Sequence, residues 1–339
     1  MVTFTKERLT SLCDQFVGKR VVVVGDLMLD RYFWGTVGRI SPEAPVPVVE
    51  VDSESTRLGG AANVANNIAS LGGVPIMVGV VGDDDAGEIL KSIVQDQGFP
   101  TSGIILDESR PTTLKTRVIA HNQHVVRIDH EVKTEISEDV QQKILKSIEQ
   151  QIDSIDGIIL EDYNKGVLGK SLIVRILEMA KKKRKIVTVD PKFNNFFVYK
   201  DVTVFKPNRK ETEEALGARL QTDTSIEKAG KELLHRLNAE NVLLTLGEKG
   251  MTLFERDGTI TNVPTAARKV ADVSGAGDTV VSTLTVALAA GADIRESATL
   301  ANVAGGIVCG EVGIVPIDKQ LLFETVLTSV DGSAENRHG

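Results

Sequence analysis

A short segment near the C-terminal end, residues 272–279 (DVSGAGDT), combines the residue types that chemistry on an anion requires. Gly275 and Gly277, on either side of Ala276, permit backbone angles that bring main-chain N–H groups close to a ligand. The small-residue apolar stretch that follows predicts a helix, and free N–H groups at a helix start attract an anion. Asp278 falls in the first turn, where a carboxylate beside an anion suits a general base. The alternative is a glycine-rich turn with an ordinary first-turn acid.

Composition limits the classes of protein that the chain can belong to. Its 339 residues are 42% hydrophobic and 25% charged, which predicts a soluble globular protein of one large α/β domain or two smaller ones. The net charge of -8 disfavours nucleic acid and acidic membranes as partners. Two distant cysteines and five scattered histidines show no metal-binding spacing, and no apolar run is long enough to span a membrane. We therefore expect a cytoplasmic protein, since its cysteine usage suits a reducing compartment.

Strands alternate with helices through most of the chain. The valine run at 20–25 is typical of a strand that is buried on both faces, as in a parallel sheet. The pattern predicts an α/β fold with a mostly parallel sheet and helices on both faces. Strands are expected at 20–25, 75–81, 103–106, 157–160, 185–189, 202–205 and 241–246, and helices at 5–17, within 58–73, and at 86–97, 137–152, 170–183, 223–237, 280–290 and 294–309.

Two segments do not fit this alternation. Residues 31–51 contain the only tryptophan and a proline-interrupted extended run, and residues 112–130 resemble a hairpin that turns around Asn122 and Gln123. Together they predict a small β-sheet lid, and their exposed aromatic and extended character suggests the contact of a homodimer. The expected division is an α/β core of 1–30, 52–111 and 131–330, the lid of 31–51 and 112–130, and a disordered tail of 331–339.

Polar residues recur just after the predicted strands, where ligands bind in open α/β sheets. They include Asp26, Asp30, Asp162, Lys165, Asp190, Lys192, Asn208 and Glu211. At the start of the helix predicted within 58–73, Gly59 and Gly60 can bring N–H groups to a polar ligand, and the amide of Asn63 can contact sugar hydroxyls. Turn or capping roles for the acids, and tight helix packing around Asn63, are the structural alternatives.

These groups fit phosphoryl transfer. The anion cradle can neutralise the transferred group, and Asp278 can deprotonate an acceptor hydroxyl, an effect of ~10²–10⁴-fold. Glu211 can hold Mg²⁺, through water if not directly. On the hairpin, Arg117 and Arg127, with Asn122, can bind an anionic substrate, although they can equally form cross-strand surface pairs. The chain has neither a P-loop motif nor a dinucleotide-binding fingerprint.

Three motifs resemble those of the ribokinase-like (PfkB) carbohydrate kinases. They are the segment 273–279, the glycine-rich segment 58–72, and the NxxE pattern from Asn208 to Glu211. The resemblance implies a ribokinase-like fold, ATP and Mg²⁺ as cofactors, and a sugar as acceptor. It assigns Asp278 as the base; Gly275, Ala276 and Gly277 to the anion hole; Asn208 and Glu211 to Mg²⁺ and phosphate; Thr245, Gly247 and Asn302 to the nucleotide; Asp30, Gly59, Gly60 and Asn63 to the sugar; Asp162, Lys165, Arg117, Asn122 and Arg127 to the substrate and its far phosphate; and Asp272 and Ser274 to a monovalent cation such as K⁺.

Residues 26–32 and 39–48 narrow this resemblance to kinases of D-glycero-D-manno-heptose 7-phosphate. It implies phosphorylation of the anomeric hydroxyl to give the 1,7-bisphosphate, a step toward ADP-heptose and the lipopolysaccharide core. These 339 residues contain no resemblance to a nucleotidyltransferase, so we expect another protein to supply that step. The alternatives are a kinase of another sugar or sugar phosphate, and a non-catalytic sugar- or nucleotide-binding regulator, against which the intact Asp278 counts.

Overall fold

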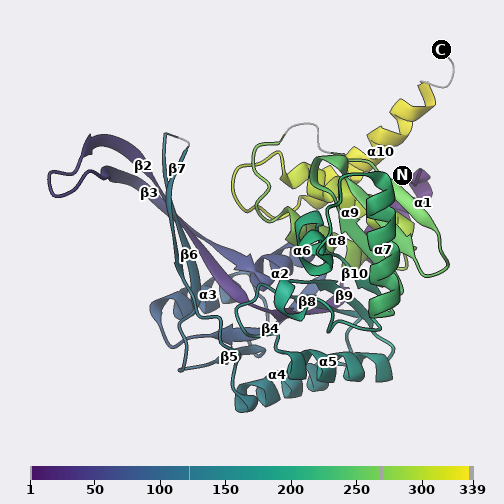
Figure 1. Cartoon of the computed structure of the whole chain (residues 1–339), viewed down its shortest axis with the longest axis horizontal. Coiled ribbons are helices and arrows are strands. Elements are labelled where there is room, and N and C mark those ends of the chain that lie inside the picture. Colours follow the sequence, from purple (N-terminus) through teal and green to yellow (C-terminus); the bar gives the residue numbers. More distant parts are fainter. Residues whose placement is uncertain (1, 122, 267–269, 336–339) are drawn as a thin grey trace.

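Two β-sheets of different size organise the chain (Figure 1). The computed structural model describes residues 2–121, 123–266 and 270–335. The large sheet has nine strands in the order β13-β12-β11-β10-β9-β8-β1-β4-β5, and all neighbours are parallel except those involving β12 and β13. The strands are β1 (Arg20–Gly25), β4 (Val74–Val81), β5 (Ile104–Leu106), β8 (Gly157–Glu161), β9 (Ile186–Asp190), β10 (Val204–Phe205), β11 (Asn241–Thr245), β12 (Met251–Glu255) and β13 (Ile260–Val263).

The valine run of β1 lies at the centre of this sheet. Val22 and Val24 pack into the hydrophobic core on one face, while Val21 and Val23 pack into the core on the other. Because successive side chains of a strand alternate between faces, only a strand covered on both sides can bury four valines in a row. The predicted mostly parallel sheet with helices on both faces is confirmed.

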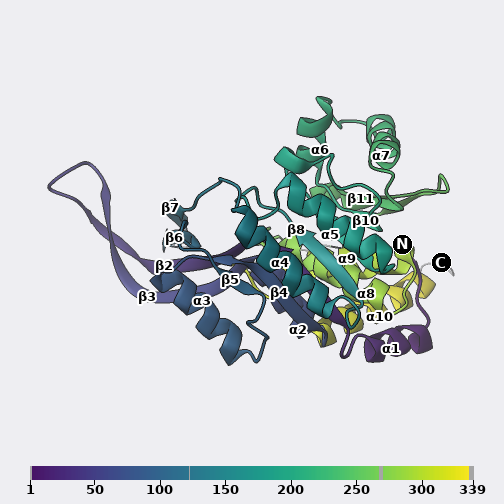
Figure 2. The ribbon, with the colours of Figure 1, turned by 90° about the horizontal axis from the view of Figure 1, so that it is seen from below.

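Helices cover both faces of the large sheet. One face carries α4 (Glu138–Gln151), α5 (Lys170–Lys182) and α7 (Asp223–Leu237), and Figure 2 looks onto α4 and α5. The other carries α1 (Lys6–Gln15), α2 (Ala61–Ser70), α3 (Asp85–Asp96), α8 (Ala276–Ala289), α9 (Ile294–Val308) and α10 (Lys319–Glu335). Short 3₁₀ turns span Phe193–Asn195 and Gly247–Lys249. In the part of the chain that the structure describes, no helix combines the length and apolarity needed to cross a membrane.

The second sheet consists of β2 (Leu27–Ile40), β3 (Pro47–Gly60), β6 (Thr113–Ala120) and β7 (Gln123–His130), in the order β3-β2-β6-β7. The first two strands are longer than the predicted segment 31–51. Their bases continue into the molecule, where Leu29 and Leu58 are buried, and their far ends extend away from the body (Figure 1). A boundary set at the change in composition therefore missed the buried part of each strand.

Two helices were not predicted. Helix α6 (Arg209–Leu216) begins within the NxxE pattern, because Asn208 caps it. Helix α10 buries Leu322 and Phe323, and the Phe323 ring lies 5.5 Å from that of Phe16. It continues to Glu335, so residues 331–335 are helical where a disordered tail was expected, and residues 336–339 lie outside the described part.

Candidate active site

Helix α8 begins with the segment that the sequence singled out. Gly275 occupies the N-cap position with a left-handed backbone (φ 78°), which glycine adopts without strain. A side chain there would also press against the amide of Asn63. The turn places Asp278 in the first helical turn, beside N–H groups that have no partner within the helix. This start of α8 can therefore present both an anion cradle and a carboxylate to the same ligand.

The carboxylate of Asp278 is buried and held on both oxygens. Asn63 Nδ2 donates to Oδ2 at 2.7 Å, and the Tyr163 hydroxyl donates to Oδ1 at 2.7 Å. Burial raises the pKa of Asp278 to about 6, with a further contribution from the charge of Asp190, while the two hydrogen bonds act in the opposite direction. Such a group is ionised at neutral pH yet basic enough to take a proton from a hydroxyl.

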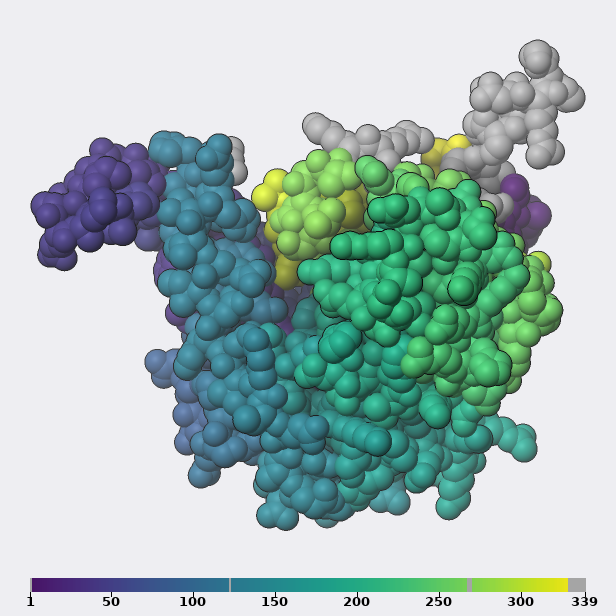
Figure 3. All heavy atoms as spheres, viewed as in Figure 1, coloured from purple at the N-terminus to yellow at the C-terminus, as the bar shows by residue number. Residues whose placement is uncertain are grey.

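A cavity of about 800 Å³ opens beside the start of α8. The molecular surface is hollowed between the second sheet and the C-terminal half of the chain (Figure 3). The cavity beside α8 is lined by residues of the C-terminal half and Tyr163. They include the four predicted residues of the α8 start, Gly275, Ala276, Gly277 and Asp278, together with the predicted nucleotide-side residues Asn208, Thr245, Gly247 and Asn302. Asn208 and Thr245 also pair as an isolated parallel β-bridge, and Asn302 Nδ2 donates to the Pro264 carbonyl at 2.7 Å.

Three buried carboxylates meet at the edge of this cavity. Oxygens of Glu161, Asp190 and Asp278 all lie within 4.8 Å of one another. Glu161 and Asp190 are register partners at the ends of the parallel strands β8 and β9. Asp190 pairs with Lys206 Nζ at 2.8 Å, whereas neither oxygen of Glu161 has a hydrogen-bond partner among the described residues. Burial, then the charges of Asp190 and Asp278, hold the pKa of Glu161 well above its usual value. An unpartnered carboxylate in such a cluster fits a divalent cation with oxygen ligands.

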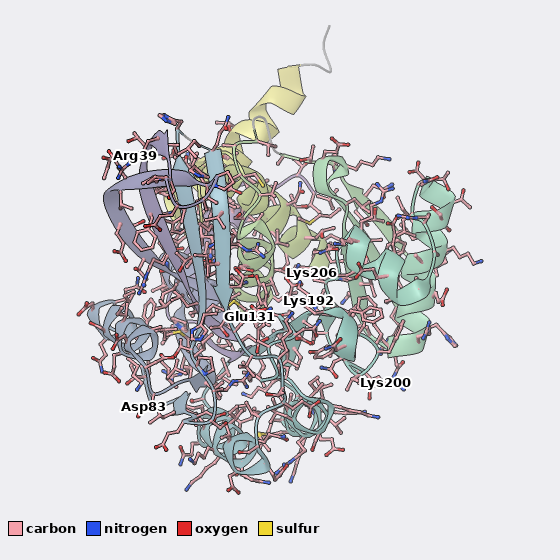
Figure 4. The ribbon with its side chains drawn as sticks, turned by 60° about the vertical axis from the view of Figure 1, so that its left-hand side comes forward. Arg39, Asp83, Glu131, Lys192, Lys200 and Lys206 are labelled. Carbon is pink, nitrogen blue, oxygen red and sulfur yellow. The ribbon has the colours of Figure 1, made fainter. Side chains whose placement is uncertain are left out.

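Glu211 is committed to local contacts. Its Oε2 accepts from the Asn208 N–H at 2.8 Å while Asn208 Oδ1 accepts from the Glu211 N–H at 2.9 Å, so the pair forms a capping box. Its Oε1 accepts from Lys192 Nζ at 2.5 Å. Figure 4 shows Lys192 and Lys206 near the middle of the molecule, where the second sheet meets the core. Glu211 therefore anchors a cation beside the cavity and itself lies behind the cavity wall.

On the side of the second sheet, Asp30 forms a buried ion pair with Arg117. Gly59 leaves the space that the Asp30 carboxylate occupies, because a side chain at Gly59 would collide with it. Gly60 caps α2 (φ 55°), which brings Asn63 to Asp278. The structure thus joins two segments that the sequence could only treat separately, the start of α2 and the start of α8.

The loop after β8 is fixed by a buried acid at the end of β1. Asp26 accepts hydrogen bonds from the N–H groups of Tyr163 (2.8 Å), Lys165 (3.1 Å) and Val167 (3.2 Å). This anchoring aims the Tyr163 hydroxyl at Asp278. Asp162 is also buried, but it accepts from the Tyr199 hydroxyl at 2.7 Å and so shapes the loop from behind.

The model of the pfkB family carbohydrate kinases matches residues 19–319. The chain belongs to this family. Bifunctional protein HldE of Desulfatibacillum aliphaticivorans is 46% identical over 304 residues, which cover 90% of this chain and 62% of that protein. The chain spans 60–64% of the length of such curated relatives.

Solved structures show the fold. Arabidopsis thaliana ribokinase complexed with ribose and ATP matches with a TM-score of 0.72 and 21% identity, over 91% of this chain and 99% of that one. Escherichia coli phosphofructokinase-2 in complex with potassium matches with a TM-score of 0.74 and 21% identity, over 92% of this chain and 100% of that one. The ribokinase-like fold is confirmed. The family match confirms the prediction of a carbohydrate kinase.

Other predicted residues of this PfkB-family kinase lie elsewhere. Arg127 is on the edge strand β7, whose residues are all exposed, and it pairs with Asp129 at 2.9 Å. The structure does not bring it to the cavity, because β7 is one strand farther out than β6. Asn122 lies outside the described residues. Lys165 pairs with Glu131 at 2.7 Å. The positions of these residues in the motifs could not predict which of them lie at the cavity and which form ion pairs elsewhere.

The predicted monovalent-cation pair sits where two loops meet. Asp272 Oδ1 accepts from the Ser274 N–H at 2.9 Å, and Oδ2 accepts from the Gly313 N–H at 3.1 Å. The carboxylate thereby ties the turn before α8 to the loop after α9. The cation itself remains a prediction.

Several residues at the site were not predicted as site residues. Tyr163 contacts Asp278 directly, and two ammonium groups, Lys115 Nζ and Lys192 Nζ, each lie 5.1 Å from its ring centroid. Glu161 and Lys206 join the carboxylate cluster. Position at a strand end could have found Glu161, since it is the last residue of β8. Nothing in the sequence distinguishes Lys115 from other charged residues of a hairpin.

Proposed function

We propose that the chain phosphorylates the anomeric hydroxyl of D-glycero-D-manno-heptose 7-phosphate with ATP and gives the 1,7-bisphosphate, for the synthesis of ADP-heptose and the lipopolysaccharide core. The observation that carries the kinase chemistry is the buried, doubly hydrogen-bonded Asp278 beside the cavity. Two further points support the heptose phosphate: the resemblance carried by residues 26–32 and 39–48, and the similarity to relatives named bifunctional protein HldE.

In this mechanism the acceptor hydroxyl replaces one of the two hydrogen bonds on Asp278. Asp278 takes the hydroxyl proton as the oxygen forms a bond to the γ-phosphorus, and the bond to the oxygen that bridges the β- and γ-phosphates breaks, which releases ADP. The N–H groups at the start of α8 stabilise the negative charge on the transferred group. Asn63 retains the second carboxylate oxygen and fixes the direction of proton transfer.

A Mg²⁺ ion fits the residues present. The unpartnered, buried Glu161 and its neighbour Asp190 would hold it, and Glu211, whose oxygens are committed to N–H donors, would act through water. When bound, the ion neutralises charge on the phosphates. Asp272 and Ser274 would border a K⁺ ion, as an adjunct of the same proposal. Lys192 and Lys206 border the cavity and would contact the phosphates.

The proposal includes a cytoplasmic homodimer formed through the second sheet. Ile40, Val51 and Ile128 on its strands are 61%, 54% and 57% exposed. Apolar side chains gathered on one extended sheet suit contact with a second copy. A monomer at micromolar concentration in light scattering would refute this part without affecting the activity.

A substrate panel tests the function. Heptose 7-phosphate, fructose 6-phosphate, ribose and unphosphorylated heptose are each offered with ATP, and ADP release is measured. NMR then locates the new phosphate. We expect turnover to be fastest with heptose 7-phosphate and the new phosphate to be on the anomeric oxygen. Faster turnover of another sugar would identify a different acceptor, and binding without turnover of any sugar would favour a regulator.

A further inference from the structure

Lys115, on β6, has an ammonium group that pairs with no carboxylate of the described residues. It makes no ion pair or hydrogen bond within the described ranges 2–121, 123–266 and 270–335, although two carboxylates lie near it. Asp30 is paired with Arg117, and Glu131 is paired with Lys165 at 2.7 Å. Its one specific contact is with the ring of Tyr163, at 5.1 Å from the ammonium nitrogen to the ring centroid. Both nearby carboxylates therefore already have a cationic partner, and the ammonium group of Lys115 is available to a ligand.

The surroundings oppose this charge. Burial lowers the pKa of Lys115, and the neighbouring cations Lys165 and Arg117 lower it further, while Asp30 and Glu131 act in the opposite direction. A half-buried ammonium group among other cations is destabilised unless an anion joins it. Around this position three cations, Lys115, Lys165 and Arg117, therefore outnumber two carboxylates that are already paired.

Tyr163 connects Lys115 with the proposed base, Asp278. The Tyr163 hydroxyl is 2.7 Å from Asp278 Oδ1, and its ring faces Lys115. Lys115 and Asp278 thus contact two parts of one tyrosine side chain, its ring and its hydroxyl. A sugar of six or seven carbons that lies along this ring, with its reacting hydroxyl at Asp278, would place the far end of its carbon chain at Lys115.

We propose that Lys115 binds a phosphate ester on the acceptor, at the end remote from the reacting hydroxyl, and so restricts the acceptor to sugar phosphates. This inference rests on the proposed function. It replaces Arg127, which the structure does not bring to the site, and it leaves Arg117 in its pair with Asp30. Lys115 is not assigned to the phosphates of the nucleotide, because Lys192 and Lys206 line the cavity beside α8 and Lys115 does not.

Charge removal tests the assignment. Lys115→Met and Lys115→Arg are compared with Lys133→Met, a control whose side chain is 69% exposed and 3.6 Å from Glu131. For Lys115→Met we expect kcat/KM for heptose 7-phosphate to fall by about 10–100-fold, the size expected for one charged hydrogen bond. For unphosphorylated heptose and for ATP we expect changes below about threefold. Lys115→Arg should restore most of the activity, and Lys133→Met should behave as the unmodified protein.

Equal losses for phosphorylated and unphosphorylated sugar would overturn the inference, because Lys115 would then act only by packing on Tyr163. A raised KM for ATP with no change for the acceptor would assign Lys115 to the nucleotide instead. Calorimetric titration with heptose 7-phosphate and with inorganic phosphate needs no turnover, and unchanged affinities in Lys115→Met would also overturn it.

The same measurements separate this inference from the proposed function. Turnover of a different sugar phosphate, with the loss in Lys115→Met confined to that substrate, would reject heptose 7-phosphate and keep the role of Lys115. Turnover of unphosphorylated sugars alone would keep the kinase and reject the role of Lys115.

Discussion

The groups of the proposed acceptor site come from two regions of the molecule that are built by different means. On the α8 side, the functional groups are main-chain N–H groups and one buried carboxylate, and Gly275 at the N-cap fixes the backbone. On the side of the second sheet, long charged side chains such as Lys115 and Arg117 project from strands. The first arrangement depends on helix geometry and can serve any phosphoryl acceptor. The second depends on the identity of single side chains, so we propose that it is the side that selects the acceptor.

The largest expected effect tests the α8 side. Asp278→Asn removes the proposed base and keeps the shape, so kcat should fall by about 10²–10⁴-fold or more while ATP still binds. Steady-state turnover and calorimetric titration with ATP measure the two parts. Asp257→Asn, on the exposed β12–β13 turn, is a matched control. Near-normal turnover of Asp278→Asn would place the base elsewhere.

A second variant tests the carboxylate cluster. Glu161→Gln keeps the shape and removes the unpartnered charge. We expect the midpoint of Mg²⁺-dependent thermal stabilisation, measured without nucleotide, to rise by about tenfold or more, because a carboxylate ligand is lost. An unchanged Mg²⁺ midpoint would show that the ion binds without Glu161.

The pH profile tests how Asp278 is held. Only its ionised form accepts a proton, so kcat/KM should rise with pH through a midpoint near the pKa of Asp278, about 6. The Tyr163 hydrogen bond favours the ionised form, and Tyr163→Phe should therefore move this midpoint to higher pH. A profile that keeps its midpoint in Tyr163→Phe would mean that the limb reports another group.

The smallest effect is expected at the outer edge of the second sheet. Arg127→Ala breaks only an exposed pair with Asp129, and such pairs contribute about 0–1 kcal/mol. Its kcat/KM for heptose 7-phosphate should change by less than about threefold, in contrast to Lys115→Met. A loss as large as that of Lys115→Met would extend the selective surface to β7.

Local patterns predicted the features that depend on neighbours in sequence. The valines of β1 and the glycine turn before Asp278 are of this kind, since strand burial and helix starts follow from adjacent residues. The contact between Asn63 and Asp278 joins positions 215 residues apart, and no local pattern encodes it. The committed state of Glu211 also escaped prediction, because an NxxE pattern describes a capping box and a metal ligand equally well.

At the first of its crossings between the two sheets, the chain has a single intervening residue. Asp26 alone separates β1 from β2, and its carboxylate also holds the loop that carries Tyr163. Replacing the whole second sheet with that of a relative is therefore not a suitable way to change the acceptor. A chimera cut at this junction would disturb Tyr163 and, through it, the base. Exchange of acceptor preference should instead be designed one side chain at a time on β6, with Asp26 and its three hydrogen bonds left intact.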